Sequence, residues 1–106
     1  MNSEQMYEIA FNIIIHAGES RSLSGDAMDA AEEGEFDKAK DLLDKANEEF
    51  LKCHKIQTDL LTSEANGESN ELNLIFIHAQ DHLTMATMAM DNARRLIRVY
   101  KKISKD

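Results

Sequence analysis

The chain contains no proline, and only two short segments with glycine interrupt its helical periodicity. Gly34 ends the first helical stretch and suits a left-handed cap, and Asn66-Gly67 gives a turn signal after the second. The sequence therefore predicts helices at about 3–33, 36–65 and 70–103. Because short connections make sequential helices antiparallel, we expect an all-α, up-down-up three-helix bundle, with residues 1–106 as a single domain.

Each predicted helix carries apolar residues at helical spacing, which is typical of a helix that packs against a core. The predicted core positions are Met6, Ile9, Ile13, Ala17, Ser20, Ser24, Ala27, Met28 and Ala31; Phe36, Ala39, Leu43, Ala46, Phe50, Cys53, Gln57 and Leu60; and Leu72, Ile75, Phe76, Ala79, Leu83, Ala86, Met90, Ala93, Ile97 and Tyr100.

The third predicted helix has a second stripe of apolar residues, namely Leu74, Ile77, Met85 and Met88. His78, Asp81 and His82 lie on or beside this second stripe, at spacings that place them on one side of the helix. The positions left for solvent are Asn73, Gln80, Thr84, Asp91, Arg94 and Arg98. A helix with two apolar stripes is buried on two sides, and in so short a chain we expect the second side to meet another subunit. The reactive cluster is therefore expected at or near a subunit interface.

The net charge is −8, from 12 Lys and Arg against 20 Asp and Glu. Nucleic-acid binding requires a basic surface, so this charge argues against a nucleic-acid partner. An acidic protein suits a basic protein partner, although an ordinary solvated acidic face is the more common interpretation of such residues.

Cys53 is the only cysteine and shares a helix face with Phe50 and Leu60, so we expect a buried thiol rather than a reactive one. A single cysteine forms no intramolecular disulfide, which agrees with a reducing compartment. No signal peptide is visible, and no stretch reaches the ~18 apolar residues of a membrane span. We therefore expect a cytosolic protein without direct membrane insertion.

The run His78-Ala79-Gln80-Asp81-His82-Leu83 resembles the signature of the lactose/cellobiose-type IIA component of the bacterial phosphoenolpyruvate-dependent sugar phosphotransferase system. The segments at 17–22, 33–39 and 65–68 resemble the same family in the expected order, so the resemblance covers nearly the whole chain. Thr84 and Thr87 depart mildly from the family's pattern. Members of the family are homotrimers of three-helix chains, which is the assembly that the resemblance implies here.

His78 is the candidate phosphoryl acceptor. A neutral imidazole is a competent nucleophile at cytosolic pH, and its phosphoramidate remains a high-energy donor. From the residues alone, a structural histidine on an amphipathic helix is the more common interpretation. The resemblance reverses that judgement, because the first histidine of the family's motif is the phosphorylated one.

Asp81 is the candidate metal ligand. The residues alone leave an ordinary surface aspartate equally acceptable, but the resemblance implies a motif aspartate near the threefold axis that holds a divalent metal. Three such carboxylates would repel one another, and a hard cation such as Mg²⁺, shared by three subunits, would relieve the repulsion with oxygen ligands. No Cys or His spacing suggests zinc.

Gln80 and His82 are supporting candidates. The Gln80 amide is suited to donate to a phosphoryl oxygen, although the helical wheel turns it to solvent, and His82 is suited to hydrogen-bond the phosphoryl group or position His78. Each is equally compatible with a plain surface residue. His16 is expected to be a satisfied structural histidine, with an approach to the site as the alternative, and His54 a surface residue.

The resemblance implies a cytosolic phosphocarrier. It would take a phosphoryl group from the phosphohistidine of HPr and pass it to a cysteine of a sugar-specific IIB component, which serves the IIC permease during uptake of cellobiose, chitobiose, lactose or related β-glucosides. The rival interpretation is a non-catalytic helical adaptor or metal-binding bundle, in which the His and Asp cluster is structural.

Overall fold

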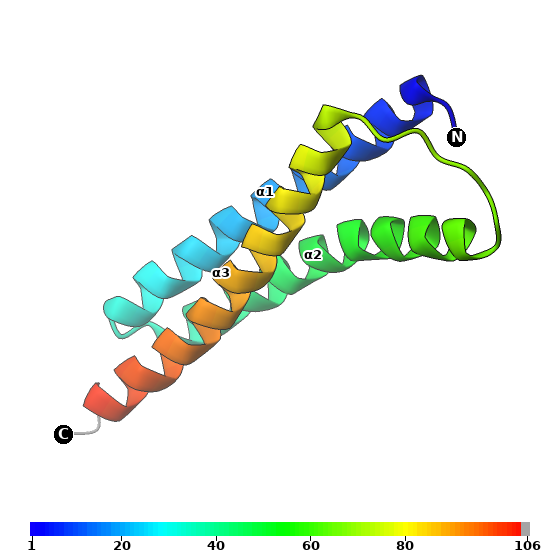
Figure 1. Ribbon diagram of the computed structural model, residues 1–106. Helices are drawn as coiled ribbons and strands as arrows, with labels where there is room; N and C mark the ends of the chain where they lie inside the picture. The colour runs from blue at the N-terminus through cyan, green and yellow to red at the C-terminus, as the bar shows by residue number, and fades with distance from the viewer. Residues whose placement is uncertain (105–106) are drawn as a thin grey trace.

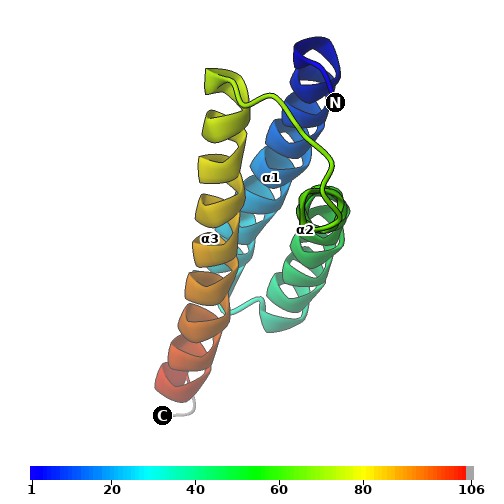
Figure 2. The ribbon, with the colours of Figure 1, turned by 45° about the vertical axis from the view of Figure 1, so that its right-hand side comes forward.

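The computed structural model describes residues 1–104 and confirms the predicted antiparallel order of three helices. They are α1 (Ser3–Glu32), α2 (Phe36–Ala65) and α3 (Leu74–Ser104), and residues 1–104 contain no strand. Helix α1 packs along both neighbours, whereas α2 and α3 touch each other less (Figure 1). Both views show that α2 bends near its middle, and Figure 1 shows its C-terminal half diverging from α3 (Figures 1 and 2). The connection at 66–73 crosses the resulting separation.

The two turns agree with the glycine signals in the sequence. Gly34 has a φ of 81° and Gly67 a φ of 90°, in the left-handed region that side chains other than glycine rarely enter. At the start of α1, Asn2 and Gln5 form a reciprocal capping box, which satisfies two free backbone donors.

Helix α3 begins at Leu74 rather than at residue 70, so the predicted helix start is wrong by about one turn. The Asn73 side chain accepts a hydrogen bond from the Phe76 N–H at 2.9 Å, as an N-cap residue does. Asn73 is therefore half-buried instead of facing solvent. Leu72 lies outside the helix, where the helical wheel has no meaning, and is 69% exposed instead of lying in the core.

The core near the sequence motif is built mainly from small side chains. Its buried members come from all three helices: Ala10, Ile13, Ala17, Cys53, Ala79, Leu83 and Ala86. Ala79 and Leu83 are 0% and 4% exposed, which fixes the rotation of α3 about its axis. Because residues on a helix are set about 100° apart, this rotation turns His78 and Asp81 outward. The core thus determines which motif residues a partner can reach.

Candidate functional site

His78 and His82 form a close pair one turn apart on α3. Their Nε2 atoms lie 3.1 Å apart, and the rings meet edge to face with centroids separated by 4.6 Å. His78 is exposed and His82 is half-buried. When both rings are neutral, an N–H at one Nε2 donates a hydrogen bond to the other Nε2. The sequence prediction that His82 lies beside His78 is confirmed.

The surface around His78 is apolar. An open hollow of about 450 Å³ is lined by Tyr7, Leu74, Ile75 and His78. Tyr7 begins a row of exposed apolar residues on α1, with Phe11 and Ile15 exposed by 53% and 63%. This row lies outside the core positions predicted for α1, although its spacing of four residues is a helical signal in the sequence. His78 therefore stands at the rim of an apolar surface made by two helices.

The second stripe of α3 is largely exposed in the single chain. Leu74, Ile77 and Met88 are 81%, 50% and 60% exposed, and Met85 is half-buried. Asp81 lies exposed on the same face, with no ion pair to any of residues 1–104. Apolar side chains gathered on one face of a soluble chain mark an interaction surface.

Within residues 1–104, no three His, Cys, Asp or Glu side chains come together to hold a metal ion. Among the described residues of α3, one copy of the chain contributes only the Asp81 carboxylate to this face. A hard cation needs about six oxygen ligands. The donor type therefore fits Mg²⁺, but a complete set of ligands would need further copies of the chain or water.

Gln80 does not face solvent as predicted. It is half-buried, and its Oε1 accepts a hydrogen bond from Nε2 of Gln57 on α2. Its own Nε2 is buried with no partner. Two residues along a helix point about 200° apart, so Gln80 and His78 occupy opposite flanks of α3. The single chain does not bring the two together.

Gln57 and Gln80 help to line a cavity of about 220 Å³ between the start of α1, the end of α2 and the start of α3. The remaining lining residues are mostly apolar: Met6, Leu60, Leu61, Glu64, Leu72 and Phe76. The cavity lies on the side where α2 bends away from α3, and no residue pattern in the sequence indicates that bend (Figure 1).

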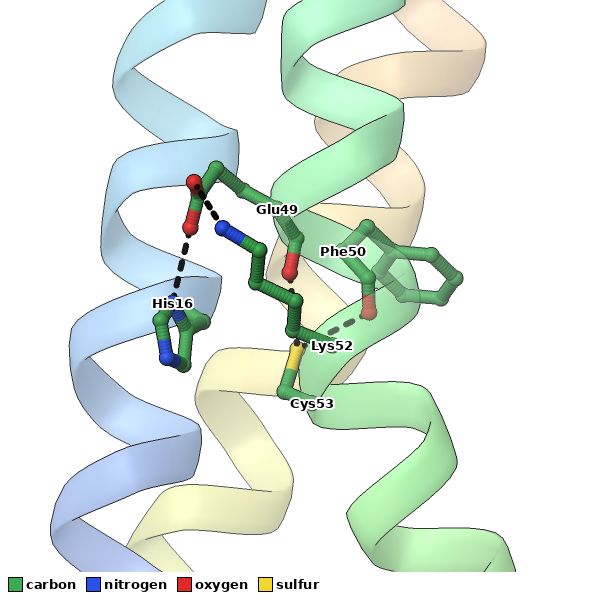
Figure 3. Close-up of polar contacts among 5 residues, drawn as sticks. All are labelled: His16, Glu49, Phe50, Lys52 and Cys53. Atoms are coloured by element: carbon green, nitrogen blue, oxygen red, sulfur yellow. Dashed lines mark hydrogen bonds and ion pairs between the residues drawn. The ribbon is translucent and has the colours of Figure 1, made fainter.

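His16 joins α1 to α2 and is a satisfied histidine, as expected. Its Nδ1 lies 2.7 Å from Glu49 Oε2, and Lys52 Nζ donates to Glu49 Oε1 at 2.8 Å (Figure 3). These contacts, first Lys52 and then His16, lower the pKa of Glu49 below its ordinary value of 4.5.

Cys53 is buried, as predicted, and burial raises the pKa of its thiol above the ordinary value. His54 is exposed and stacks on Phe50.

The Glu49 contacts predict a pH-dependent contribution to stability. A lowered pKa in the folded state means that the contribution is present above about pH 4.5 and disappears as the pH falls through the folded pKa. Glu49→Gln is expected to lower the free energy of unfolding at pH 7, because it removes the charge from the contacts with Lys52 and His16. The expected loss is only about 1 kcal/mol, because solvent partly screens the carboxylate. Urea titrations at several pH values should show this difference shrinking toward acid. The neighbouring variant Glu48→Gln is the control, and an equal loss there would contradict the assignment.

The family model for the "PTS system, Lactose/Cellobiose specific IIA subunit" matches residues 8–101. The chain is 42% identical over 102 residues to the lichenan-specific phosphotransferase enzyme IIA component of Bacillus subtilis, and the match covers 96% of this chain and 93% of that protein.

None of the helices within residues 1–104 is long and apolar enough to cross a membrane.

Two solved structures share the fold. The cellobiose-specific enzyme IIA of Bacillus anthracis has a TM-score of 0.90 and 36% identity, covering 93% of this chain and 91% of that one. The chitobiose IIA protein in its complex with HPr, from the Escherichia coli phosphotransferase system, has a TM-score of 0.80 and 29% identity, covering 93% and 96%.

Proposed function

Since the chain belongs to the lactose/cellobiose-specific IIA family of the sugar phosphotransferase system, we propose that it is a cytosolic phosphocarrier that works through His78. The observation that carries this proposal is an exposed histidine, paired with a second histidine at 3.1 Å, at the rim of an apolar surface. A purely structural histidine would be expected to lie among protein groups that satisfy it, as His16 does.

The proposed reaction is two successive in-line transfers. In the first, the N–P bond of phospho-HPr breaks while an N–P bond forms on the His78 imidazole. In the second, that bond breaks while an S–P bond forms on a cysteine of the IIB component. The phosphoryl group carries most of its charge on peripheral oxygens, so positioning and hydrogen bonding contribute more than acid-base chemistry. In the tautomer that carries hydrogen on Nε2, the N–H of His82 is suited to donate a hydrogen bond to one of those oxygens.

The apolar rim suits a carrier that must meet two different partners in turn. An apolar surface has few polar groups that require a particular hydrogen-bond partner, so it can pack against different proteins. The half-buried Met85 adds a flexible side chain nearby. The similarity to a chitobiose IIA protein in complex with HPr supports HPr as the donor. The relatives' names include lichenan, lactose, cellobiose and chitobiose, so we propose a β-glucoside or a related sugar of the cellobiose, chitobiose or lactose type, delivered through the matching IIB and IIC components.

We further propose that three copies assemble through the second stripe, with Asp81 near the threefold axis. The exposure of Leu74, Ile77 and Met88 supports an interface there, because it is unfavourable to leave these apolar side chains in contact with water. Three Asp81 carboxylates would hold a divalent cation, most simply Mg²⁺, and the cation would offset their mutual repulsion.

Intact-mass measurement tests the carrier function. The chain, mixed with phosphoenolpyruvate, enzyme I and HPr, is expected to gain the mass of one phosphoryl group, and to lose it when the matching IIB component is added. Omitting HPr should prevent the gain. A chain that gains no mass in the complete mixture would favour the structural adaptor over the carrier.

A further inference from the structure

The face of α3 that carries Asp81 continues well beyond the candidate site. Positions seven residues apart return to nearly the same side of a helix, with a drift of about 20° for each heptad. Counting in sevens from Asp81 leads to Met88, Arg95 and Lys102. The accumulated drift at Arg95 is about 40°, which lies within an ordinary contact stripe of ~100°. Arg95 therefore shares a face with Asp81.

Apolar side chains on both sides of Arg95 support the continuation of this face. Met88 lies one heptad before it, and Val99 and Ile103 follow within about two turns. They are 60%, 48% and 63% exposed, although the helix buries Ala93 and Ile97 on its opposite side. An interface that covers Ile77 and Met88 and continues along α3 also covers Val99.

Arg95 itself has no counter-charge within residues 1–104. The adjacent Arg94 donates to Asp91 at 3.0 Å, but none of the carboxylates in the described part of the chain lies within ion-pair distance of Arg95. Asp81 and Asp91 are the only acidic residues of α3. Asp81 lies fourteen residues away, about 21 Å along the axis, so it cannot neutralise Arg95.

We propose that three copies of Arg95 form an anion-binding layer on the axis of the assembly, which takes a small divalent oxyanion such as sulfate or inorganic phosphate. This inference rests on the proposed trimer. Three guanidinium groups brought together repel one another unless an anion lies between them, just as the three carboxylates need a cation. Guanidinium groups match the oxygens of such anions with paired hydrogen bonds. Asn92, exposed on the same face, adds an amide donor one layer away.

The test is thermal denaturation of the full chain with millimolar sodium sulfate or phosphate, against sodium chloride at equal ionic strength. The wild-type Tm is expected to rise and then saturate, as a binding site requires. Arg95→Met should lose this response and melt higher than the wild type without sulfate, because it removes the repulsion. Arg95→Gln, which removes the charge but keeps polarity, should also lose the response. Arg98→Met, another exposed arginine of α3 off this face, should respond like the wild type.

Several outcomes would overturn the anion layer. These are a wild-type Tm that ignores sulfate, an equal response in Arg95→Met, and a response that appears only in Asp91→Asn. The last result would mean that Arg95 pairs with Asp91 of a neighbouring copy. Sedimentation and phosphoryl uptake on the same samples keep the proposals apart. A monomer that takes up phosphoryl groups would remove the anion layer and the trimer, but not the carrier function.

Discussion

Replacing His78 with alanine is expected to abolish phosphoryl uptake completely, because no other side chain would supply the accepting nitrogen. The Nε2 of His82 lies only 3.1 Å from that of His78, but His82 is half-buried whereas His78 is exposed. The variant should keep its fold, since His78 is exposed and alanine favours helix. Intact-mass measurement with phosphoenolpyruvate, enzyme I and HPr should show no added phosphoryl group, while circular dichroism should show an unchanged Tm.

The chain supplies matched controls for this experiment. His54→Ala removes an exposed histidine from α2, and His16→Ala removes one that is tied to Glu49. Both variants should gain one phosphoryl group per chain, although His16→Ala should be less stable. A His78→Ala protein labelled on any other histidine would show that the accepting residue has been assigned wrongly.

Removing divalent metal is expected to weaken the assembly strongly, and Asp81→Leu should make the assembly independent of metal. Without the cation, three carboxylates would repel one another across the axis. Leucine removes both the repulsion and the need for a ligand, and apolar replacement of buried charges often stabilises a protein by about 1–4 kcal/mol. Sedimentation of the wild type should give three times the chain mass, falling after chelation. The Asp81→Leu protein should stay trimeric with or without chelator.

The Asp81 variant also separates assembly from chemistry. His78 remains in place, so Asp81→Leu should still gain a phosphoryl group in the intact-mass experiment. Asn92→Leu is a useful comparison, because it adds an apolar residue to the same face without removing a carboxylate, and it should keep the wild type's dependence on metal. A wild-type protein indifferent to chelator, or an Asp81→Leu protein that dissociates, would mean that Asp81 does not hold an axial metal.

The sequence predicted the helices well because their signals are local. Gly34 and Gly67 mark turns through backbone freedom alone, and the stripe of α2 places Cys53 in the core without knowledge of its neighbours. The start of α3 was predicted wrongly for the same reason: the apolar Leu72 extends the periodic pattern, while the cap at Asn73 decides where the helix begins.

Other wrong predictions concern the residues of a neighbouring helix that a side chain contacts. The helical wheel gives Gln80 a direction, but only the position of Gln57 on another helix shows that this direction is occupied. The row of Tyr7, Phe11 and Ile15 was overlooked because the stronger core stripe of α1 accounts for the helix by itself. Sequence reasoning therefore found the motif residues, but the hollow beside His78 needed the relative placement of α1 and α3.

The small side chains of the core affect the expression level that the protein needs in order to accumulate in a cell. Most of the apolar residues that residues 1–104 bury are alanines, and the only large ones are Met6, Ile13, Leu60, Leu83, Met90 and Ile97, so a lone bundle buries little apolar area for its length. Its folded population should then rise with chain concentration, because association draws on the folded form. Chains made in excess of their partners would unfold more often and be degraded sooner. Assembly would in this way set a lower limit on the expression level at which the protein accumulates.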